Sequence, residues 1–583
     1  MNTQTSSVKT IGGVPTLTIN DEPFYSPAYV TYLPKNNNYE LFKNAGIHMY
    51  SVCVYFGGQT INEDSEINLP TTKGIFDEKG KPDFSIADRD FQRIIDIDPQ
   101  AKIFPRVNMS LPRWWEEENP DELNDNPSYG KKWDNLGNTS NVKEKKRVCM
   151  DSKKWLEQTN EFLKIFIEHY KNSEIGNYII GLQLAGGSTE EWFPFDFNSG
   201  IGKRTREEFE KSPLNDGTEG ALYRFIAENM ANSISYLAKT AKECTNNKIV
   251  VGVFYGYTLE CIDRKRNSGA LSVILACPYI DFICAPLSYA QTRKPGIDHS
   301  CITALDSITL NGMLYFTEAD ERTYLSLYPY EHEGLCKDGT YTDPIWKGPK
   351  DAYTTRQVLK NDFARQLIHS NNFWWFDMWG GWYNDKGIME DMAKEAEIMK
   401  NSVTLADRRY VAELAVFIDE KTHYISDSHN NVGFNFRIPI GSSGVPYAVY
   451  EMSDFDKVKD NYKAIILLEP YKTQCIDNAK ITLENENKAF MVLTNDIILT
   501  PELFREFARK NGLHIYIESN DVVHVCNNFI SVHKGENTER KTVINLPGVR
   551  KITPIIDEGE SFVSNKIELE LDPFETRLYK LDD

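Results

Sequence analysis

Short apolar runs of strand length alternate with amphipathic helices over the first two thirds of the chain. Eight such strand–helix units in about 400 residues predict a (β/α)8 barrel with enlarged loops, which we assign to residues 1–408. A short leading hairpin is expected at residues 8–20. The expected barrel strands are 24–33, 48–56, 102–108, 178–184, 248–255, 281–289, 313–317 and 372–383, and the expected helices include 39–45, 86–96, 151–171, 222–244 and 352–370.

The pattern changes after a helix expected at residues 389–407, and all ten tryptophans lie before residue 383. Runs that are apolar throughout predict a parallel sheet covered on both faces, so we expect a flavodoxin-like α/β domain at 409–525. Its first strand is not followed by a glycine-rich phosphate loop, so nucleotide binding is not expected there. Its expected strands are 414–418, 445–450, 464–468, 489–493 and 514–517.

Short alternating strands fill the end of the chain, at 529–532, 542–546 and 567–571. Inward and outward alternation of this kind predicts a small antiparallel β-sandwich, which we assign to residues 526–583.

Composition narrows the classes of partner. The chain has 583 residues, of which 65 are basic and 85 acidic, giving a net charge of −20. Nucleic acids and anionic membranes are therefore not expected as partners. There is no apolar run of membrane-spanning length and no signal-peptide core at the start, so we expect a cytoplasmic protein, although removal of a signal would leave the same start. Ten cysteines occur singly without a CxxC pair, which favours free thiols and gives no sign of a zinc cluster.

Two of the expected barrel strands end in acidic residues. The fourth runs into AGGSTEEWF (185–193) and the seventh into TEADERT (317–323). The carboxyl ends of barrel strands meet at one face, so Glu191 and Glu318 should face each other across the barrel mouth. Two carboxyl groups in that position can catalyse the hydrolysis of a glycosidic bond. A separation of about 5–5.5 Å between them corresponds to the retaining mechanism.

The two acids are expected to have different roles. Glu191 is the expected proton donor, because the aromatic residues that follow it could desolvate its carboxyl group and raise its pKa. Glu190 is the rival, since only one of two neighbouring side chains can face the cleft easily. Glu318 is the expected nucleophile, and Arg322 could keep it or a neighbouring acid ionised. The structural alternatives are two solvated loop acids and a surface acid cluster balanced by one arginine.

Other residues near the expected strand ends are candidates for binding a sugar. Arg106 and Asn108 end the third strand, although a structural arginine–carboxylate pair is the alternative. Tyr289 ends the sixth strand and could donate a hydrogen bond to the nucleophile or fill the barrel mouth. Asp377 could accept hydrogen bonds from hydroxyl groups or cap its loop. Because sugar sites are often aromatic, the remaining candidates are Trp115, Trp379 and Trp382.

Other hydrolytic chemistries are poorly supported. The chain has no Gly-x-Ser-x-Gly elbow and no His-Glu-x-x-His motif. His332, between Glu331 and Glu333, is a weak metal candidate. We expect neither a metal nor a cofactor.

Together with PLSYAQTR (286–293), the two glutamate motifs resemble those of the clan A retaining glycosidases. The order of barrel, flavodoxin-like domain and small β-domain is similar to that of the family 42 β-galactosidases and closer to the related family 164 β-mannosidases. The resemblance implies a retaining, exo-acting β-glycosidase of β-mannosidase type, or alternatively of β-galactosidase type. It further implies an oligosaccharide or glycoside substrate, no cofactor and a homotrimer.

One departure from the resemblance concerns the proton donor. Many clan A enzymes have asparagine directly before it, where this chain has Glu190, so the choice between Glu190 and Glu191 stays open. Two other hypotheses are a catalytically inactive barrel that binds glycans and a barrel enzyme of unrelated chemistry, such as a metal-dependent hydrolase or isomerase. The identity of the sugar does not follow from the sequence, because loop geometry distinguishes axial from equatorial hydroxyl groups.

Overall fold

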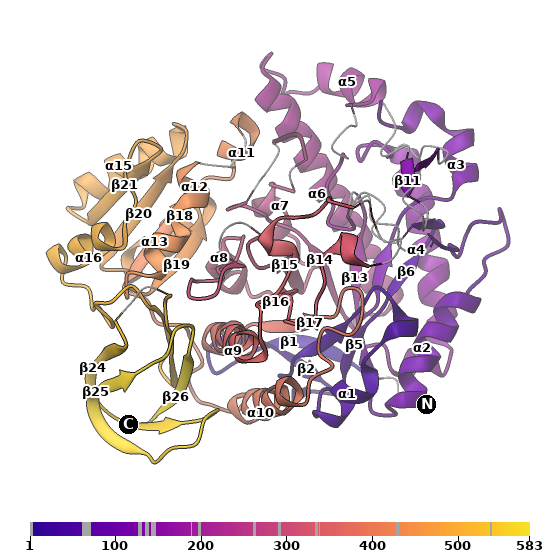
Figure 1. Cartoon of the computed structure of the whole chain (residues 1–583). Coiled ribbons are helices and arrows are strands. Elements are labelled where there is room, and N and C mark those ends of the chain that lie inside the picture. Colours follow the sequence, from indigo (N-terminus) through magenta and orange to yellow (C-terminus); the bar gives the residue numbers. More distant parts are fainter. Residues whose placement is uncertain are drawn as a thin grey trace.

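The structure, a computed structural model, describes residues 4–60, 71–125, 131–133, 139–141, 147–187, 189–195, 200–260, 264–266, 268–289, 293–332, 336, 338–426, 431–536 and 539–582. Three sheets define its architecture: a large parallel sheet, a four-stranded parallel sheet and a five-stranded antiparallel sheet at the C-terminus (Figure 1).

The large sheet is a closed barrel in which two strands are interrupted. The second strand consists of β5 (Met49–Ser51) and β6 (Cys53–Tyr55), and the third of β9 (Lys102–Ile103) and β10 (Arg106–Asn108). β5 pairs with β9, and β6 pairs with β10. β10 also pairs with the fourth barrel strand, and β5 pairs with the first. The ring of paired strands is therefore closed. The predicted eight-stranded barrel is confirmed.

The other six barrel strands are buried along their whole length, as expected for strands with side chains inside the barrel and helices outside it. This double burial is why they appear in the sequence as continuous apolar runs. They are β4 (Ala28–Val30), β13 (Gly181–Ala185), β14 (Val250–Phe254), β15 (Phe282–Pro286), β16 (Leu314–Ala319) and β17 (Asn372–Phe376).

The predicted N-terminal hairpin closes the amino-terminal end of the barrel. It consists of β1 (Ser6–Ile11) and β2 (Val14–Ile19), followed by the short β3 (Glu22–Pro23). The Ser6 amide donates to the Lys248 carbonyl at 2.8 Å, and the Val250 amide donates to the Ser6 hydroxyl at 2.9 Å. The hairpin thus caps the end of the barrel opposite to the one where the acidic motifs lie.

Helices surround the barrel. They are α1 (Tyr39–Asn44), α2 (Ser85–Ile97), α4 (Lys153–Lys171), α6 (Glu219–Cys244), α7 (Leu271–Leu275), α8 (Leu305–Leu310), α9 (Ala352–His369) and α10 (Lys386–Ser402). Of these, α8, between the sixth and seventh strands, was not predicted. Ser152, Thr218, Asp351 and Asp385 accept hydrogen bonds at the amino ends of α4, α6, α9 and α10, as N-caps do. α9 is buried on almost every side because the C-terminal sheet covers its outer face.

The four-stranded sheet is parallel, with the order β19-β18-β20-β21 expected of a flavodoxin-like sheet. The predicted fifth strand at 514–517 is wrong. Tyr516 donates its amide to the Gly444 carbonyl, and Ile517 forms only an isolated bridge with Ile544 of the C-terminal sheet. This apolar run is buried by docking. The strands are β18 (Leu414–Ile418), β19 (Tyr447–Glu451), β20 (Ala464–Glu469) and β21 (Ala489–Thr494), with α15 (Gln474–Asn485) and α16 (Pro501–Lys510) between or after them.

The C-terminal strands are antiparallel, as predicted, and belong to one hydrogen-bonded sheet with the order β22-β23-β26-β24-β25. They are β22 (Val522–Val525), β23 (Phe529–His533), β24 (Lys541–Pro554), β25 (Phe562–Glu570) and β26 (Thr576–Asp582). Within the described part of the chain, none of the helices combines the length and apolar character needed to cross a bilayer.

Candidate active site

Glu318 lies on β16, near the carboxyl end of the barrel, and residues of two other strands hold its side chain. Its Oε2 accepts hydrogen bonds from Arg106 Nη2 at 3.0 Å and from Trp374 Nε1 at 3.2 Å. Arg106 belongs to β10 and Trp374 to β17. Burial raises the pKa of Glu318 to about 8. The positive charge of Arg106 opposes this rise, and the negative charges of Asp320 and Glu191 add to it.

Glu190 points into the barrel, where its carboxylate meets the same guanidinium. Tyr55 donates to its Oε1 at 2.6 Å, and Arg106 Nη1 lies 3.5 Å from its Oε2. The two terminal nitrogens of Arg106 therefore bridge Glu190 and Glu318. The third nitrogen, Nε, lies 3.4 Å from Oε1 of Gln183. Glu190 is only 2% exposed, so it is a partner of Arg106 at the base of the site.

Glu191 is partly exposed and lies on a different side of the turn. Its Oε1 accepts a hydrogen bond from Tyr257 at 2.5 Å, and the Thr189 hydroxyl donates to its Oε2. Its charge contributes to the raised pKa of Glu318, so the two carboxyl groups are close enough to interact electrostatically. One acid of the adjacent pair is thus internal and the other is at the mouth.

A tight turn after β13 separates these neighbours. The φ angles of Thr189, Glu190 and Trp192 are 53°, 70° and 58°, in the left-handed region that non-glycine residues rarely adopt. The Trp192 amide donates back to the Gly186 carbonyl at 2.8 Å. Strand alternation therefore does not apply beyond Ala185, and no simple rule from spacing could separate Glu190 from Glu191.

The aromatic residues after the acids lie in different surroundings. The Trp192 indole is fully buried, packs against Gly186 and donates to the Leu184 carbonyl at 2.9 Å. Phe193 instead packs against Tyr257, the donor to Glu191, with ring centroids 5.2 Å apart.

Tyr289 contacts Asp320, and the hydrogen bond expected from it to Glu318 is absent from the described residues. Its hydroxyl donates to Asp320 Oδ2 at 2.5 Å, because the chain turns after β15 and the Tyr289 amide is tied to Glu260. Arg293 and Arg322 also donate to the Asp320 carboxylate. Burial alone would raise the pKa of Asp320, but the two guanidinium groups hold it below its ordinary value.

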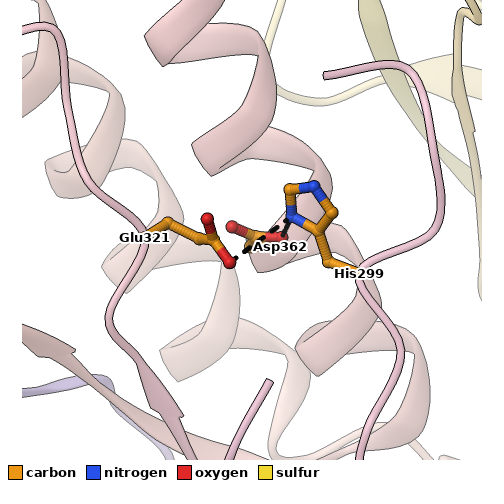
Figure 2. Close-up of side chains that lie close together, drawn as sticks. All are labelled: His299, Glu321 and Asp362. Carbon is orange, nitrogen blue, oxygen red and sulfur yellow. Dashed lines mark hydrogen bonds and ion pairs between the residues drawn. The ribbon is translucent and has the colours of Figure 1, made fainter. Parts of the chain in front are cut away.

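Among the described residues, one trio could hold a metal ion: His299, Glu321 and Asp362 (Figure 2). His299 Nδ1 lies 2.8 Å from Asp362 Oδ1 and 3.7 Å from Glu321 Oε1. Burial opposes protonation of the imidazole, but the two carboxylates raise the pKa of His299 to about 9. Arg293 Nε also lies 3.5 Å from Glu321. At neutral pH the trio already contains an imidazolium cation, so it fits a buried ion pair that ties α9 to the segment after β16.

The remaining predicted residues separate into structural and unassigned groups. Among the described residues, four groups donate to the Asp377 carboxylate: the amides of Gly381 and Trp382, which close its loop, and the side chains of Tyr29 and Asn38. Asn108 is buried and accepts from Ser110, while its Nδ2 has no acceptor in the described part of the chain.

Of the three predicted tryptophans, Trp115 is buried in α3 (Arg113–Glu118), beside a small cavity that Gly186 and Gly187 also line. Trp379 and Trp382 pack edge to face, with centroids 5.7 Å apart.

Sequence reasoning missed several residues that contact the two glutamate motifs. Tyr55 and Gln183 are strand residues, and Tyr257 follows β14 by three positions. Trp374 also belongs to a strand, β17. A signal was present for Tyr257, since the glycine and two tyrosines of YGY (255–257) come directly after an apolar strand, as in the acidic motifs.

No protein-family model matches the chain, and no curated protein matches it either. The fold has many solved relatives. The GH42 β-galactosidase Gan42B from G. stearothermophilus superposes with a TM-score of 0.59 at 11% identity, over 96% of this chain and 98% of that one. The β-galactosidase of the psychrophilic Marinomonas ef1 gives 0.60 at 10% identity, over 95% and 100%.

A third relative is the apo exo-carrageenase GH42 from Bacteroides ovatus, with a TM-score of 0.59 at 12% identity, over 99% of this chain and 86% of that one. In fold, therefore, the chain resembles the GH42 glycoside hydrolases over nearly its whole length.

Proposed function

We propose that the protein is a retaining β-glycosidase. The observation that carries this proposal is the setting of Glu318: a carboxylate at the carboxyl end of a barrel strand, held by Arg106 and Trp374, with the carboxyl group of Glu191 close enough to influence its pKa. Two interacting carboxyl groups at a barrel mouth are the requirement for double displacement at an anomeric carbon.

In the first step Glu318 attacks the anomeric carbon, and the bond to the leaving oxygen breaks as Glu191 transfers its proton to that oxygen. In the second step Glu191 removes a proton from water, the water oxygen attacks the anomeric carbon, and the ester bond to Glu318 breaks. Arg106 and Trp374 favour the ionised form of Glu318 that the first step needs. The partly exposed position of Glu191 and its hydrogen bond from Tyr257 suit a proton donor better than the buried Glu190, which is paired with Arg106.

The proton that this chemistry needs is shared between Glu318 and Glu191. Asp320 is held ionised by two arginines, whereas the pKa of Glu318 is raised to about 8 in part by Glu191. Interacting carboxyl groups of this kind share a proton and titrate as a pair. At neutral pH one proton therefore remains available to Glu191 once a substrate favours the ionised form of Glu318.

Two of the fold relatives are named β-galactosidases, so a β-galactoside is the first sugar to test and a β-mannoside the second. The test is a panel of aryl β-glycosides covering galactoside, mannoside, glucoside, fucoside, arabinoside and glucuronide, with the anomeric configuration of the product followed by NMR. Hydrolysis with retention supports the proposal, and inversion contradicts it.

The competing function is a barrel that binds glycans without cleaving them. Two results together would identify this function. Calorimetry would show that an oligosaccharide binds and stays intact on long incubation, and a glycoside with a dinitrophenolate leaving group would not be hydrolysed. Activity abolished by a chelator would instead favour metal-dependent chemistry.

A further inference from the structure

Arg322 is a buried arginine, and two of its three guanidinium nitrogens find no acceptor among the described residues. Its side chain lies between two indoles, with Cζ 5.0 Å from the ring centre of Trp346 and 5.2 Å from that of Trp382. Nη1 donates to the backbone carbonyl of Asp320 at 3.1 Å and to its carboxylate at 3.2 Å. Nε and Nη2 are buried and find no acceptor among the residues that the structure describes.

The Asp320 carboxylate does not neutralise the charge of Arg322. Arg293 Nη2 lies 2.5 Å from Asp320 Oδ1, and the guanidinium of Arg293 stacks on the ring of Tyr289 at 3.9 Å. Arg293 therefore already neutralises Asp320 in a direct pair. A guanidinium that is 3% exposed and only partly paired is costly to bury, so this position requires an explanation.

The two free nitrogens belong to one edge of the guanidinium. The N–H bonds of Nε and Nη2 run parallel, and this edge matches two oxygens of a carboxylate or another oxyanion in a bidentate contact. A neutral hydroxyl group offers only one oxygen and no charge. The geometry of the unused edge thus favours an anionic acceptor.

Trp382, beside Arg322, and Trp379, which packs edge to face against Trp382, add donors of the same kind. Nε1 of Trp379 and Nε1 of Trp382 are buried and lack acceptors in the described part of the chain. An indole N–H only donates, and a guanidinium only donates. The group formed by Arg322, Trp379 and Trp382, which we call the donor cluster, therefore fits a ligand that is rich in acceptors.

We propose that the donor cluster binds an oxyanion substituent, either a carboxylate or a sulfate ester, on the sugar whose glycosidic bond is cleaved. This inference rests on the proposed function. Arg322 follows Glu318 by four residues, just beyond the carboxyl end of β16, and shares Asp320 with Tyr289, so the cluster lies at the same end of the barrel as the proposed reacting carboxylates. Substrates with such a substituent gain a charge-assisted bidentate contact that neutral sugars lack.

The first experiment compares aryl β-glycosides that share configuration and leaving group: the neutral hexoside, the matching hexuronide and the matching hexoside sulfates. We expect kcat/KM for one charged class to exceed that of the neutral parent by about 100-fold or more, since a site built for a polar group discriminates strongly against its absence. The hexuronide and the sulfates distinguish the two sources of the oxyanion.

The second experiment substitutes the arginine. Arg322→Lys keeps the charge but removes the bidentate edge, and Arg322→Met removes both. Each should lower kcat/KM for the charged substrate by roughly 100-fold or more and for the neutral parent by less than about tenfold. Arg365→Lys is the control, because Arg365 is a buried arginine paired with Asp298 outside the donor cluster. Circular dichroism melting checks that each variant folds. If Arg322→Met does not fold, the kinetics of Arg322→Lys alone decide the test.

Equal turnover of neutral and charged substrates, or an equal loss on both in Arg322→Lys, would overturn the inference while leaving the glycosidase intact. If no glycoside is hydrolysed, the proposed function fails, and calorimetry on Glu318→Gln decides the inference separately. There we expect a hexuronate to bind at least about tenfold more tightly than the hexose, and the Arg322→Lys double variant to lose this difference. Binding that ignores the charge overturns the inference.

Discussion

One guanidinium connects both glutamate motifs at the base of the site. Arg106 reaches Glu190 with one terminal nitrogen and Glu318 with the other, and it is almost fully buried. Removing either acid would leave a buried charge less well paired, which is usually more damaging than the loss of an exposed ion pair. Glu190 is therefore expected to act on catalysis through the position of Arg106.

Glu190→Gln tests this positioning role. The amide keeps the shape of the side chain but removes the charge opposite Arg106, so we expect kcat to fall by about 10- to 100-fold. The loss should be the same for good and poor leaving groups, and azide should not restore activity. A loss confined to poor leaving groups, with rescue by azide, would instead identify Glu190 as the proton donor and exclude Glu191.

The raised pKa of Glu318 predicts how activity and stability depend on pH. The site keeps its shared proton up to about pH 8, so kcat/KM should fall above that pH. The unfolded chain releases the same proton near 4.5, the ordinary value of a glutamic acid. Between these pH values the folded state binds more protons, so the free energy of unfolding should decrease as the pH rises. Glu318→Gln should flatten this dependence, as measured by denaturant titrations at several pH values. An unchanged slope contradicts the assignment of the proton.

Residue-level prediction from the sequence succeeded where a strand fixes the side chain. Glu318 ends an apolar strand, and its position toward Arg106 follows from that placement. It failed for Tyr289, whose partner depends on how the chain turns after β15 and on the contact of its amide with Glu260. For Asp377 the loop-capping alternative applies, and of its donors only Tyr29 and Asn38 come from distant parts of the sequence.

At the scale of elements, the turn after β13 determines which acid faces which way. Its left-handed residues cluster within one short segment, and such strain is commonly found where a functional side chain must be placed. Gly187, with a φ of +70°, begins the turn, and a Cβ atom there would lie 2.4 Å from the Phe193 carbonyl oxygen. The sequence of this turn is therefore expected to tolerate little change.

Gly187→Ala tests the turn, and Gly46→Ala is its matched control. Both glycines have positive φ, but a Cβ on Gly46 would meet nothing within 4 Å. Each alanine should cost about 1–2 kcal/mol of stability from its backbone conformation. Only Gly187→Ala should also lower kcat, by tenfold or more on the scale seen for misplaced catalytic groups. Equal activity of the two variants would show that the turn does not position Glu190 and Glu191.

Element prediction depended on which surfaces bury the apolar residues. The barrel strands and three of the four strands of the four-stranded sheet are mostly buried within their own sheets, and their apolar runs were recognised. The run at 514–517 has the same character but is buried against Gly444 and the C-terminal sheet. Periodicity cannot distinguish a strand from a short segment buried by docking.

At the scale of the whole molecule, the region after the barrel supports the site from outside. Arg437 of α13 (Arg437–Gly441) donates to Glu260 at 3.1 Å, and Glu260 in turn accepts from the Tyr289 amide and the Ser288 hydroxyl. The loop that presents Tyr289 is therefore fixed partly by a residue that lies beyond residue 408. The expectation that this region serves assembly rather than catalysis does not exclude such support.

We propose that residues 409–525 mediate assembly into a homotrimer, as the resemblance to family 42 implies, with a closed ring of subunits. Light scattering coupled to size exclusion at micromolar concentration should give three times the mass of the chain. A monomer under these conditions contradicts the proposal without affecting the mechanism.

The most direct test of the account compares Glu318→Ala with Glu191→Ala on two classes of substrate. Glu318→Ala should lose several powers of ten in kcat on all glycosides, because no glycosyl-enzyme forms, and azide should yield the inverted glycosyl azide. Glu191→Ala should retain the first step on dinitrophenyl glycosides, which leave without a proton, and azide should accelerate the second step with retained configuration. The reversed pattern would exchange the two roles, and activity unchanged in both variants would contradict the glycosidase assignment itself.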